Sequence, residues 1–176
     1  AWRSNEAKMN ESPHLAYLNL GSNIQPEINL VKGIQLLQEC GKVEKCSNVW
    51  ESKSVGAEGP NYLNVCVVFS TSLSQTELRE QVTYPIESKL GRKRSENKFA
   101  PRTLDIDIVL FDDKSCDDRY WEQAFVIIPL AEVNPDYPNP LTKESVLETA
   151  TRLRREVWME IRQGVLNALS GTSSAA

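Results

Sequence analysis

The sequence contains few of the residues that most metal sites and nucleophilic sites require. Its only histidine is His14, and none of its four cysteines belongs to a C-x-x-C pair. These absences weigh against a histidine-rich zinc site, a zinc or redox cysteine motif and a Ser-His-Asp triad. Scattered thiols and the lack of a visible signal peptide favour a reducing compartment, so we expect the cytoplasm.

Long apolar runs and an excess of positive charge are also absent. No segment approaches the roughly 20 apolar residues of a membrane-spanning helix, and the net charge of −4 weighs against nucleic acid as the main partner. The chain has 176 residues and an ordinary hydrophobic share of 40%, which suffices for one domain with a substantial core. We expect that domain over residues 14–169, disordered tails at 1–13 and 170–176, no membrane partner, and a monomer or weak dimer.

The segment PRTLDIDIVLF, residues 101–111, is the most informative part of the sequence. Its β-branched content and two-residue alternation predict a strand. One face would be apolar and made of Leu104, Ile106, Ile108 and Leu110. The other face would carry Thr103, Asp105, Asp107, Val109 and Phe111. Two carboxylates would then project from the same face, roughly 6–7 Å apart at their Cα atoms.

Neighbouring carboxylates repel each other, and burying either one is costly unless a cation compensates its charge. Mg²⁺ together with substrate phosphates is the usual solution for an all-oxygen site. The alternative is a solvated edge strand, because short D-x-D patterns recur by chance. A basic cluster just upstream favours a metal-bound polyphosphate. It consists of Arg92, Lys93, Arg94, Lys98 and Arg102.

Hydrophobic periodicity and turn residues predict a β-α-β-β-α-β order. Strands are expected at 14–20, 43–52, 62–71 and 101–111, and helices at 26–40 and 74–90. Pro85 should kink or shorten the second helix. Residues 124–128 are predicted as a short strand or extended segment, and residues 142–169 as a helix. The order predicts an α+β, ferredoxin-like antiparallel sheet with helices on one face, plus a C-terminal helical region. The other face of the sheet would be free to build a site.

Five motifs occur in an order and at a spacing that are typical of one family. They are LNLGSN (18–23), VGAEGPNYLN (55–64), T-x-L-S-x-x-E-L (71–78), IESKLGRKR (86–94) and PRTLDIDIVLF (101–111). On these motifs the chain resembles the 6-hydroxymethyl-7,8-dihydropterin pyrophosphokinases of folate biosynthesis, from Tyr17 to about Pro135. The resemblance implies that ATP gives its β,γ-diphosphate to the hydroxymethyl oxygen of the reduced pterin. It also implies two Mg²⁺ ions that bridge the phosphates and the strand aspartates.

The resemblance assigns individual residues as well. Asp105 and Asp107 are the implied metal ligands, and with Arg92 and Arg102 they form the implied catalytic set. The implied ATP contacts are Glu87, Arg92, Arg94, Lys98 and Arg102. The implied pterin contacts are Ser52, Val55, Tyr62, Asn64 and Phe125. The loops around residues 53–61 and 93–100 are expected to close over the substrates and exclude water.

Departures from the family pattern keep alternatives open. Phe99 and Ala100 stand where a tryptophan and a glycine are usual, and Pro85 interrupts the second helix. The histidine and arginine that follow the aspartate strand are missing, and Gln123 occupies the usual arginine position. Arg119 lies nearby and could replace that arginine. One alternative is a catalytically weakened homologue that binds pterin or nucleotide as a partner of another folate enzyme. The other is an RNA-binding module, which the negative net charge disfavours.

Overall fold

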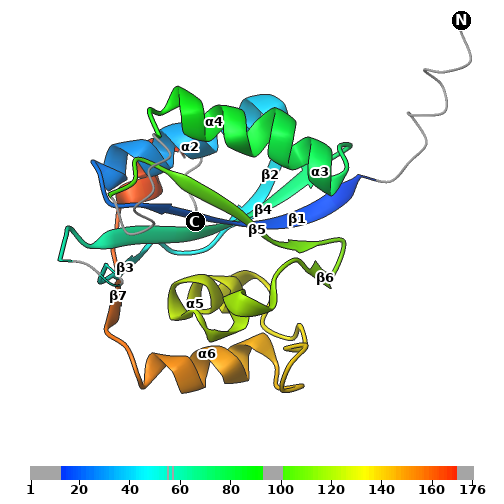
Figure 1. The fold of residues 1–176 in the computed structure, drawn as a ribbon, viewed down its shortest axis with the longest axis vertical. Helices are drawn as coiled ribbons and strands as arrows, with labels where there is room; N and C mark the ends of the chain where they lie inside the picture. Colours follow the sequence, from blue (N-terminus) through cyan, green and yellow to red (C-terminus); the bar gives the residue numbers. More distant parts are fainter. Residues whose placement is uncertain (1–12, 55, 57, 93–100, 170–176) are drawn as a thin grey trace, which may run out of the picture.

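The computed structural model describes residues 13–54, 56, 58–92 and 101–169. A seven-stranded antiparallel sheet forms the middle layer, with helices on both of its faces (Figure 1). One face is covered by α2 (Pro26–Cys40), α3 (Gln75–Leu78) and α4 (Tyr84–Lys89), and the other by α5 (Ala124–Val133) and α6 (Val146–Arg154). The helices of the predicted β-α-β-β-α-β order thus do lie on one face, whereas the other face, which was predicted to be free, is covered by α5 and α6. The apolar segments after the aspartate strand need a surface on which to bury their side chains, and the second face of the sheet provides it.

The strands follow the order β6-β5-β1-β4-β3-β7, and β2 pairs with the remaining length of β4. Their bounds are β1 His14–Ser22, β2 Lys42–Cys46, β3 Trp50–Ser52, β4 Tyr62–Thr71, β5 Asp105–Phe111, β6 Lys114–Ser115 and β7 Met159–Ile161. The strand predicted over 43–52 is thus divided into β2 and β3. The aspartate strand β5 pairs with β1 over its whole length, so its position is fixed against one of the most buried strands of the sheet.

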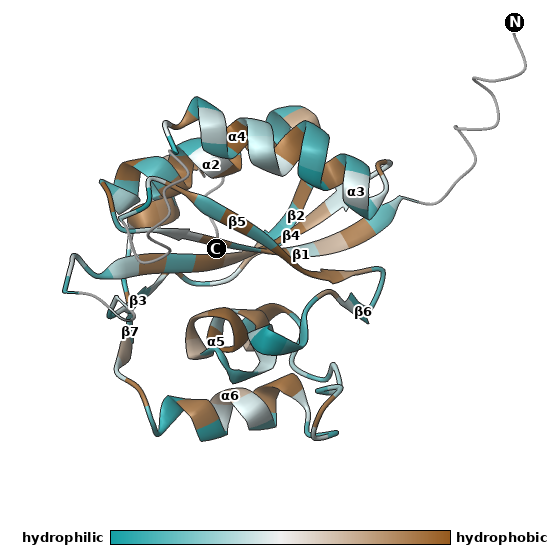
Figure 2. Ribbon diagram, viewed as in Figure 1, coloured by the Kyte–Doolittle hydropathy of each residue, from teal (hydrophilic) through white to brown (hydrophobic). Residues whose placement is uncertain are grey.

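Alternating side chains of the central strands fill two cores, one on each face of the sheet. In Figure 2 the ribbon of α5 is mostly brown, the colour of hydrophobic residues. Leu18, Leu20 and Ile106 belong to the core beneath α2 and α4. Tyr17 and Val68 belong to the core shared with α5 and α6. Because both faces are covered, the strands are apolar over much of their length. On the α5 face, Asn19, Asn64, Asp105 and Asp107 lie together at one end of β1, β4 and β5.

A β-bulge at Val109 changes the alternation of the aspartate strand. Tyr17 pairs with Leu110 and Leu18 pairs with Ile108, so Val109 is the extra residue. Leu110 therefore joins the α5-side core and Phe111 the α2-side core, opposite to the strict alternation predicted above. The bulge lies beyond the two aspartates, so the prediction that they share one face is unaffected.

The helix predicted over 74–90 continues past Pro85. Ser74 and Glu77 form a capping box at its start, and a π-helical turn, Arg79–Thr83, joins α3 to α4. Pro85 falls in the first turn of α4, where its missing N–H is tolerated. The helix accordingly reaches Lys89 and carries Glu87 into the interior, where that residue is only 3% exposed.

Residues 124–133 form a helix rather than the predicted short strand. The segment AFVIIPLAEV is almost uniformly apolar because it lies between the sheet and α6. A uniformly apolar run has no periodicity that distinguishes a helix from a strand. The stretch before it contains β6 and a 3₁₀ turn, Asp118–Glu122.

The helix predicted over 142–169 is wrong in its second half. Ser145 and Glu148 form the capping box that starts α6, which ends at Arg154. The chain then forms β7, which pairs antiparallel with β3, and a short 3₁₀ helix at Val165–Leu169. The free edge of β3 offers backbone hydrogen bonds that override the helical pattern. Within the described part of the chain, no helix is long and apolar enough to cross a membrane.

Candidate active site

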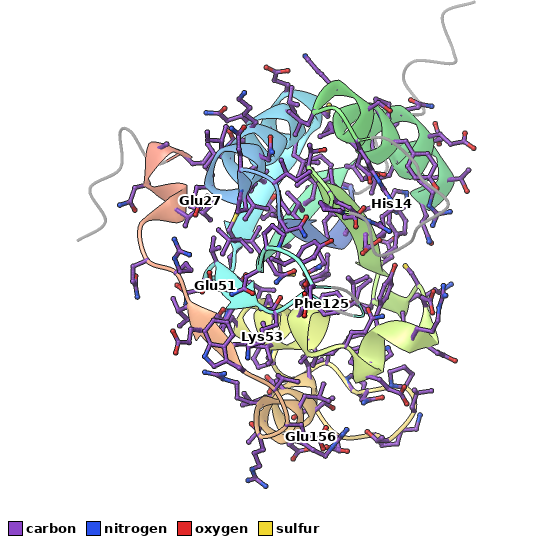
Figure 3. The ribbon with its side chains drawn as sticks, turned by 60° about the vertical axis from the view of Figure 1, so that its left-hand side comes forward. His14, Glu27, Glu51, Lys53, Phe125 and Glu156 are labelled. Atoms are coloured by element: carbon purple, nitrogen blue, oxygen red, sulfur yellow. The ribbon has the colours of Figure 1, made fainter. Side chains whose placement is uncertain are left out.

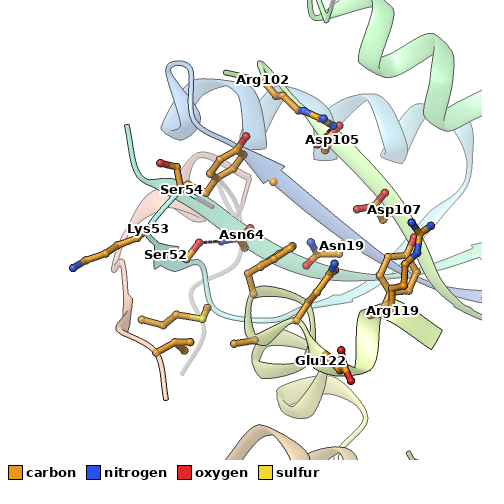
Figure 4. Close-up of a pocket in the computed structure, with 18 of the residues that line it drawn as sticks. Asn19, Ser52, Lys53, Ser54, Asn64, Arg102, Asp105, Asp107, Arg119 and Glu122 are labelled. Atoms are coloured by element: carbon orange, nitrogen blue, oxygen red, sulfur yellow. Dashed lines mark hydrogen bonds and ion pairs between the residues drawn. The ribbon is translucent and has the colours of Figure 1, made fainter. Parts of the chain in front are cut away.

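A pocket of ≈ 790 Å³ lies on the α5 side of the sheet, and its floor is built by β1, β4 and β5 (Figure 4). Gly21 pairs with Asp105 on one side and with Asn64 on the other, and Asn19 pairs with Asp107 in the next row. Gly21 has no side chain to fill the centre of this floor, and a Cβ there would lie 3.2 Å from Oδ1 of Asn64. The carboxylate pair and Asn64 therefore face the same cavity across a glycine.

The walls of the pocket come from segments far apart in the sequence. The first wall is Ser52 at the end of β3 with Lys53 and Ser54 after it. The second comes from the 3₁₀ turn and the start of α5, and consists of Tyr120, Glu122, Gln123, Ala124 and Phe125. The third is Val157, Trp158 and Met159, before and in β7. Lys53 and Phe125, both labelled in Figure 3, belong to two of these walls. Nζ of Lys53 lies 5.9 Å from the centroid of the Trp158 ring, so the segment after β3 contacts the segment before β7.

Asp105 is paired with two arginines. Nη1 of Arg102 lies 2.7 Å from its Oδ2, and Nη1 of Arg92 lies 2.9 Å from its Oδ1. Arg92 also contacts the carboxylate of Glu87, whose side chain is 4% exposed. Glu87, Arg92 and Asp105 thus form a continuous chain of charges that leads from the interior beneath α4 to the pocket.

Asp107 has a different environment, although it is only two residues away. Among the described ion pairs, Arg92 and Arg102 both engage Asp105 and neither engages Asp107. Burial, followed by repulsion from Asp105, raises the pKa of the Asp107 carboxyl to about 6. A bound divalent cation would favour the ionised form of this carboxyl.

The residues present fit a Mg²⁺ site that substrate phosphates complete. Asp105 and Asp107 both line the pocket and supply hard oxygen donors. Within the described ranges, no group of three or more His, Cys, Asp or Glu side chains is arranged to hold a metal ion. Mg²⁺ commonly binds through one or two carboxylates while phosphates and waters fill its other positions. The pair therefore suits an ion that arrives with a nucleotide.

The other side of the pocket floor is built for a neutral, flat ligand. Nδ2 of Asn64 donates to Oγ of Ser52 at 2.8 Å and to the carbonyl oxygen of Trp50 at 3.4 Å. Because the amide nitrogen has its partners within the protein, Oδ1 is the atom that faces Gly21 and the cavity. Tyr62 and Phe125 add aromatic surfaces to the same cavity. A heterocycle with an N–H edge is the kind of ligand that such groups recognise.

The pocket brings together most of the predicted site residues. Those that line it are Ser52, Tyr62, Asn64, Arg102, Asp105, Asp107 and Phe125. Glu87 and Arg92 do not line it and are connected to it through Asp105. Outside the described residues lie Val55, Arg94, Lys98, Phe99 and Ala100, together with the rest of 93–100, residues 1–12 of the predicted tail at 1–13, and the predicted tail at 170–176.

Sequence reasoning does not find several residues that line the pocket. Asn19 lies on the same face of β1 as Gly21, so alternation along that strand could have indicated it. Trp158 and Met159 could not be found, because their position depends on the pairing of β7 with β3. Arg119 does line the pocket, but its Nη2 lies 2.6 Å from Oδ2 of Asp117 and its side chain is 84% exposed.

Comparison with known proteins places this site in a family. The model of the 7,8-dihydro-6-hydroxymethylpterin-pyrophosphokinase (HPPK) family matches residues 17–135. This chain belongs to the HPPK family. The HPPK match includes every strand of the pocket floor and the start of α5, whereas Trp158 and Met159 lie beyond it.

Individual HPPK relatives cover most of the chain. A 2-amino-4-hydroxy-6-hydroxymethyldihydropteridine pyrophosphokinase from Synechocystis sp. is 35% identical over 146 residues, which cover 77% of this chain and 74% of that protein. The protein of the same name from Bacillus subtilis is 39% identical over 132 residues, which cover 68% of this chain and 78% of that protein. The HPPK resemblance predicted from the five motifs is confirmed.

Solved structures support the fold. An HPPK-DHPS crystal structure in complex with substrates matches with a TM-score of 0.63 at 12% identity, over 83% of this chain and 44% of that one. Wild-type HPPK-DHPS of Plasmodium falciparum with SDX-DHP gives a TM-score of 0.60 at 12% identity, over 82% and 45%. This chain spans less than half of each solved chain. At that identity the likeness concerns the fold alone, and it confirms a mixed α/β architecture with an antiparallel sheet.

Proposed function

We propose that this chain is a pyrophosphokinase that transfers the β,γ-diphosphate of ATP to the hydroxymethyl oxygen of 6-hydroxymethyl-7,8-dihydropterin and releases AMP. The observation that carries the proposal is the shared cavity, in which Asp105 lies across Gly21 from Asn64 and Asp107 lies in the next row of the same face. One end of the cavity suits a polyphosphate with its cation, and the other suits a flat heterocycle. Transfer between two bound substrates needs this adjacency, because such catalysis rests on positioning and charge stabilisation.

We assign Asp105 and Asp107 as the protein ligands of two Mg²⁺ ions. When bound, the ions would neutralise phosphate oxygens and the charge that develops during transfer. Arg102 and Arg92 would hold phosphate oxygens on the side of Asp105, where both guanidinium groups already lie. Arg94 and Lys98 stay predicted contacts of ATP. Metal binding and arginine binding at Asp105 compete for the same oxygens, so we expect an arginine to shift toward the phosphates when the nucleotide enters.

Glu87 has a positioning role in this proposal. Its carboxylate is buried and contacts Arg92, which in turn reaches Asp105. A buried carboxylate holds a guanidinium in one orientation, and it balances the positive charge while the pocket is empty of anions. Glu87 would therefore affect ATP through Arg92 rather than by touching the nucleotide, which is a more specific role than the ATP contact predicted from the sequence.

The pterin would bind over Asn64 with Tyr62 and Phe125 against its ring. Oδ1 of Asn64 would accept a hydrogen bond from an N–H of the pterin, because the Nδ2 of the same amide is already held by Ser52. Ser52 thereby fixes the orientation of Asn64 and also lines the cavity. Val55 stays a predicted contact. With the pterin in this place, its substituent can extend across Gly21 toward the carboxylate pair.

A catalytically weakened homologue is the second candidate, and Arg119 is the observation that favours it. Gln123 stands at the usual arginine position, and the nearby Arg119 is held by Asp117 on the pocket wall. The enzyme proposal requires that a polyphosphate draws Arg119 away from Asp117. An RNA-binding role is not favoured, because such a sheet presents exposed aromatics, whereas Phe69 on the central strand β4 is 0% exposed.

The proposal also covers the topology of the sheet, the oligomeric state, the cellular compartment and the partners. The order β5-β1-β4 with β2 and β3 beside β4, linked by α2 and by α3 and α4, supports a ferredoxin-like arrangement. We further propose a monomer or weak dimer that acts in the cytoplasm without a nucleic-acid or membrane partner.

The direct test is AMP formation from ATP, Mg²⁺ and 6-hydroxymethyl-7,8-dihydropterin. We expect turnover that requires both substrates and falls at least about 10³-fold in Asp107→Ala, because that change removes a metal ligand from the transition state. Asp136→Asn, which alters an exposed aspartate of the α5–α6 loop, serves as the matched control and should retain full activity. Pterin binding by calorimetry without any AMP formation would favour the weakened homologue instead.

A further inference from the structure

Asn19 is a buried polar residue whose side-chain oxygen lacks a hydrogen-bond partner. It is 3% exposed, and its Oδ1 is one of only two buried side-chain oxygen or nitrogen atoms without a partner among the described residues. Buried polar atoms of folded proteins are nearly always paired, so an exception in a pocket requires an explanation. An apolar side chain of similar size would cost less at this position, because it would leave no acceptor unpaired.

The strand register places Asn19 between the two ends of the pocket. It is paired directly with Asp107 on β5 and lies one row from Asn64 on β4. Directly paired residues have Cβ atoms roughly 5 Å apart, and diagonal neighbours roughly 7–8 Å. Figure 4 shows Asn19 between Asn64 and Asp107 on the pocket floor. An atom held by Asn19 is thus within reach of both the proposed metal ligands and the proposed pterin site.

We propose that Asn19 binds the exocyclic hydroxyl group of the pterin and so sets the position of the oxygen that attacks ATP. This inference rests on the proposed function. The hydroxyl donates its hydrogen to Oδ1 of Asn19, which leaves the lone pairs of the same oxygen free to face the phosphate. A hydroxyl is the donor that fits, because the pterin ring is placed over Asn64 and its one-carbon arm extends across Gly21 toward Asp107.

The arrangement also explains how the site would separate the hydroxymethyl substrate from close analogues. A pocket that offers an unpaired acceptor to a substrate hydroxyl rejects a ligand without that hydroxyl, because the acceptor then stays buried and unpaired. A 6-methyl pterin would make every ring contact in the same pocket but could not donate a hydrogen bond to Oδ1 of Asn19. Asn19 is therefore a specificity-determining residue for the arm of the pterin, and Asn64 for its ring.

The test compares two ligands rather than two rates. Calorimetry measures the dissociation constants of 6-hydroxymethyl- and 6-methyl-7,8-dihydropterin in the presence of Mg²⁺ and α,β-methylene-ATP, which does not transfer its diphosphate. We expect the wild-type protein to prefer the hydroxymethyl ligand by about tenfold or more. Asn19→Ala should lower this preference at least fivefold and leave the affinity for the methyl ligand within about twofold. Asn19→Ser, which keeps a hydroxyl acceptor, should retain part of the preference.

Controls distinguish the loss of the Asn19 contact from a loss of folding and from a failure of the proposed function. Gln38→Ala removes an exposed amide from α2, on the far side of the sheet, and should leave the preference unchanged. The melting temperature of Asn19→Ala should not fall as it does for Asn64→Ala, because only the second change removes formed hydrogen bonds. An unchanged preference in Asn19→Ala would overturn the inference alone. Absence of binding by either pterin to the wild-type protein would overturn the proposed function and this inference with it.

Discussion

Replacing Asp107 with asparagine should stabilise the protein while it destroys the proposed metal site. Burial and the adjacent Asp105 raise the pKa of the Asp107 carboxyl from 3.8 to about 6. The folded protein therefore holds this proton at pH values where the unfolded chain has released it. Stability contributed by this group is full below the unfolded pKa and declines as the pH rises toward 6.

The magnitude follows from the difference between the two pKa values. Each pKa unit corresponds to about 1.4 kcal/mol, so the Asp107 carboxyl costs the folded state up to about 3 kcal/mol at pH 8. At pH 4.5 the folded carboxyl is still protonated and the unfolded one is largely ionised, and the cost falls to about 1 kcal/mol. The substitution Asp107→Asn removes the ionisable group, so the variant carries no charge at this position at either pH. The free energy of unfolding should therefore rise by up to about 3 kcal/mol at pH 8, with a gain in melting temperature of roughly 2–4 °C per kcal/mol.

The assay is urea unfolding followed by tryptophan fluorescence, at pH 8 and pH 4.5, with EDTA to keep divalent cations away. Asp136→Asn is the matched control, since it changes an exposed aspartate by the same atoms and should shift stability by less than about 0.5 kcal/mol. Two results would refute the reasoning: an Asp107→Asn variant no more stable than wild type at pH 8, or a stability gain that is equal at the two pH values.

Two further predictions concern the arginines of the site. Arg92→Leu leaves the carboxylate of Glu87 buried without its partner, so we expect urea titrations to show a loss of about 3–5 kcal/mol of unfolding free energy. The double variant Glu87→Leu/Arg92→Leu should recover a large part of this loss. A double variant as unstable as the single one would contradict the pairing. Arg119→Ala should raise the KM for ATP about tenfold with little change in the KM for the pterin. The melting temperature should also change little, because the pair that Arg119 forms with Asp117 is exposed. Steady-state kinetics that show equal effects on both substrates would exclude a phosphate contact for Arg119.

Local patterns predicted the floor of the pocket well. Alternation along residues 101–107 places Asp105 and Asp107 on one face, and the structure pairs that face with Gly21 and Asn19 of β1. The structure places Asn64 opposite Gly21, in a register of β1 and β4 that keeps the apolar residues of both strands on shared faces. These features depend on short segments whose composition indicates their own structure.

The walls were harder to predict because they depend on long-range pairing. β7 forms only because β3 presents a free edge, and the helical spacing of residues 142–169 gave no indication of it. The bulge at Val109 depends on how β5 fits against Tyr17 and Leu18, which no pattern within β5 reveals. Helix α5 lacks periodicity because it is buried on several sides, so Phe125 could be identified by family resemblance but not by its secondary structure.

The pairing of β7 with β3 has a consequence for when the pocket becomes complete. Of the described residues that line the cavity, all lie at or before Phe125 except Val157, Trp158 and Met159. During synthesis, the strands of the floor can therefore leave the ribosome and pair while one wall is still missing. A nascent chain would hold an open carboxylate pair until β7 docks, and only then would the ring of Trp158 lie against Lys53. Binding competence is thus coupled to the docking of a three-residue strand at the edge of the sheet.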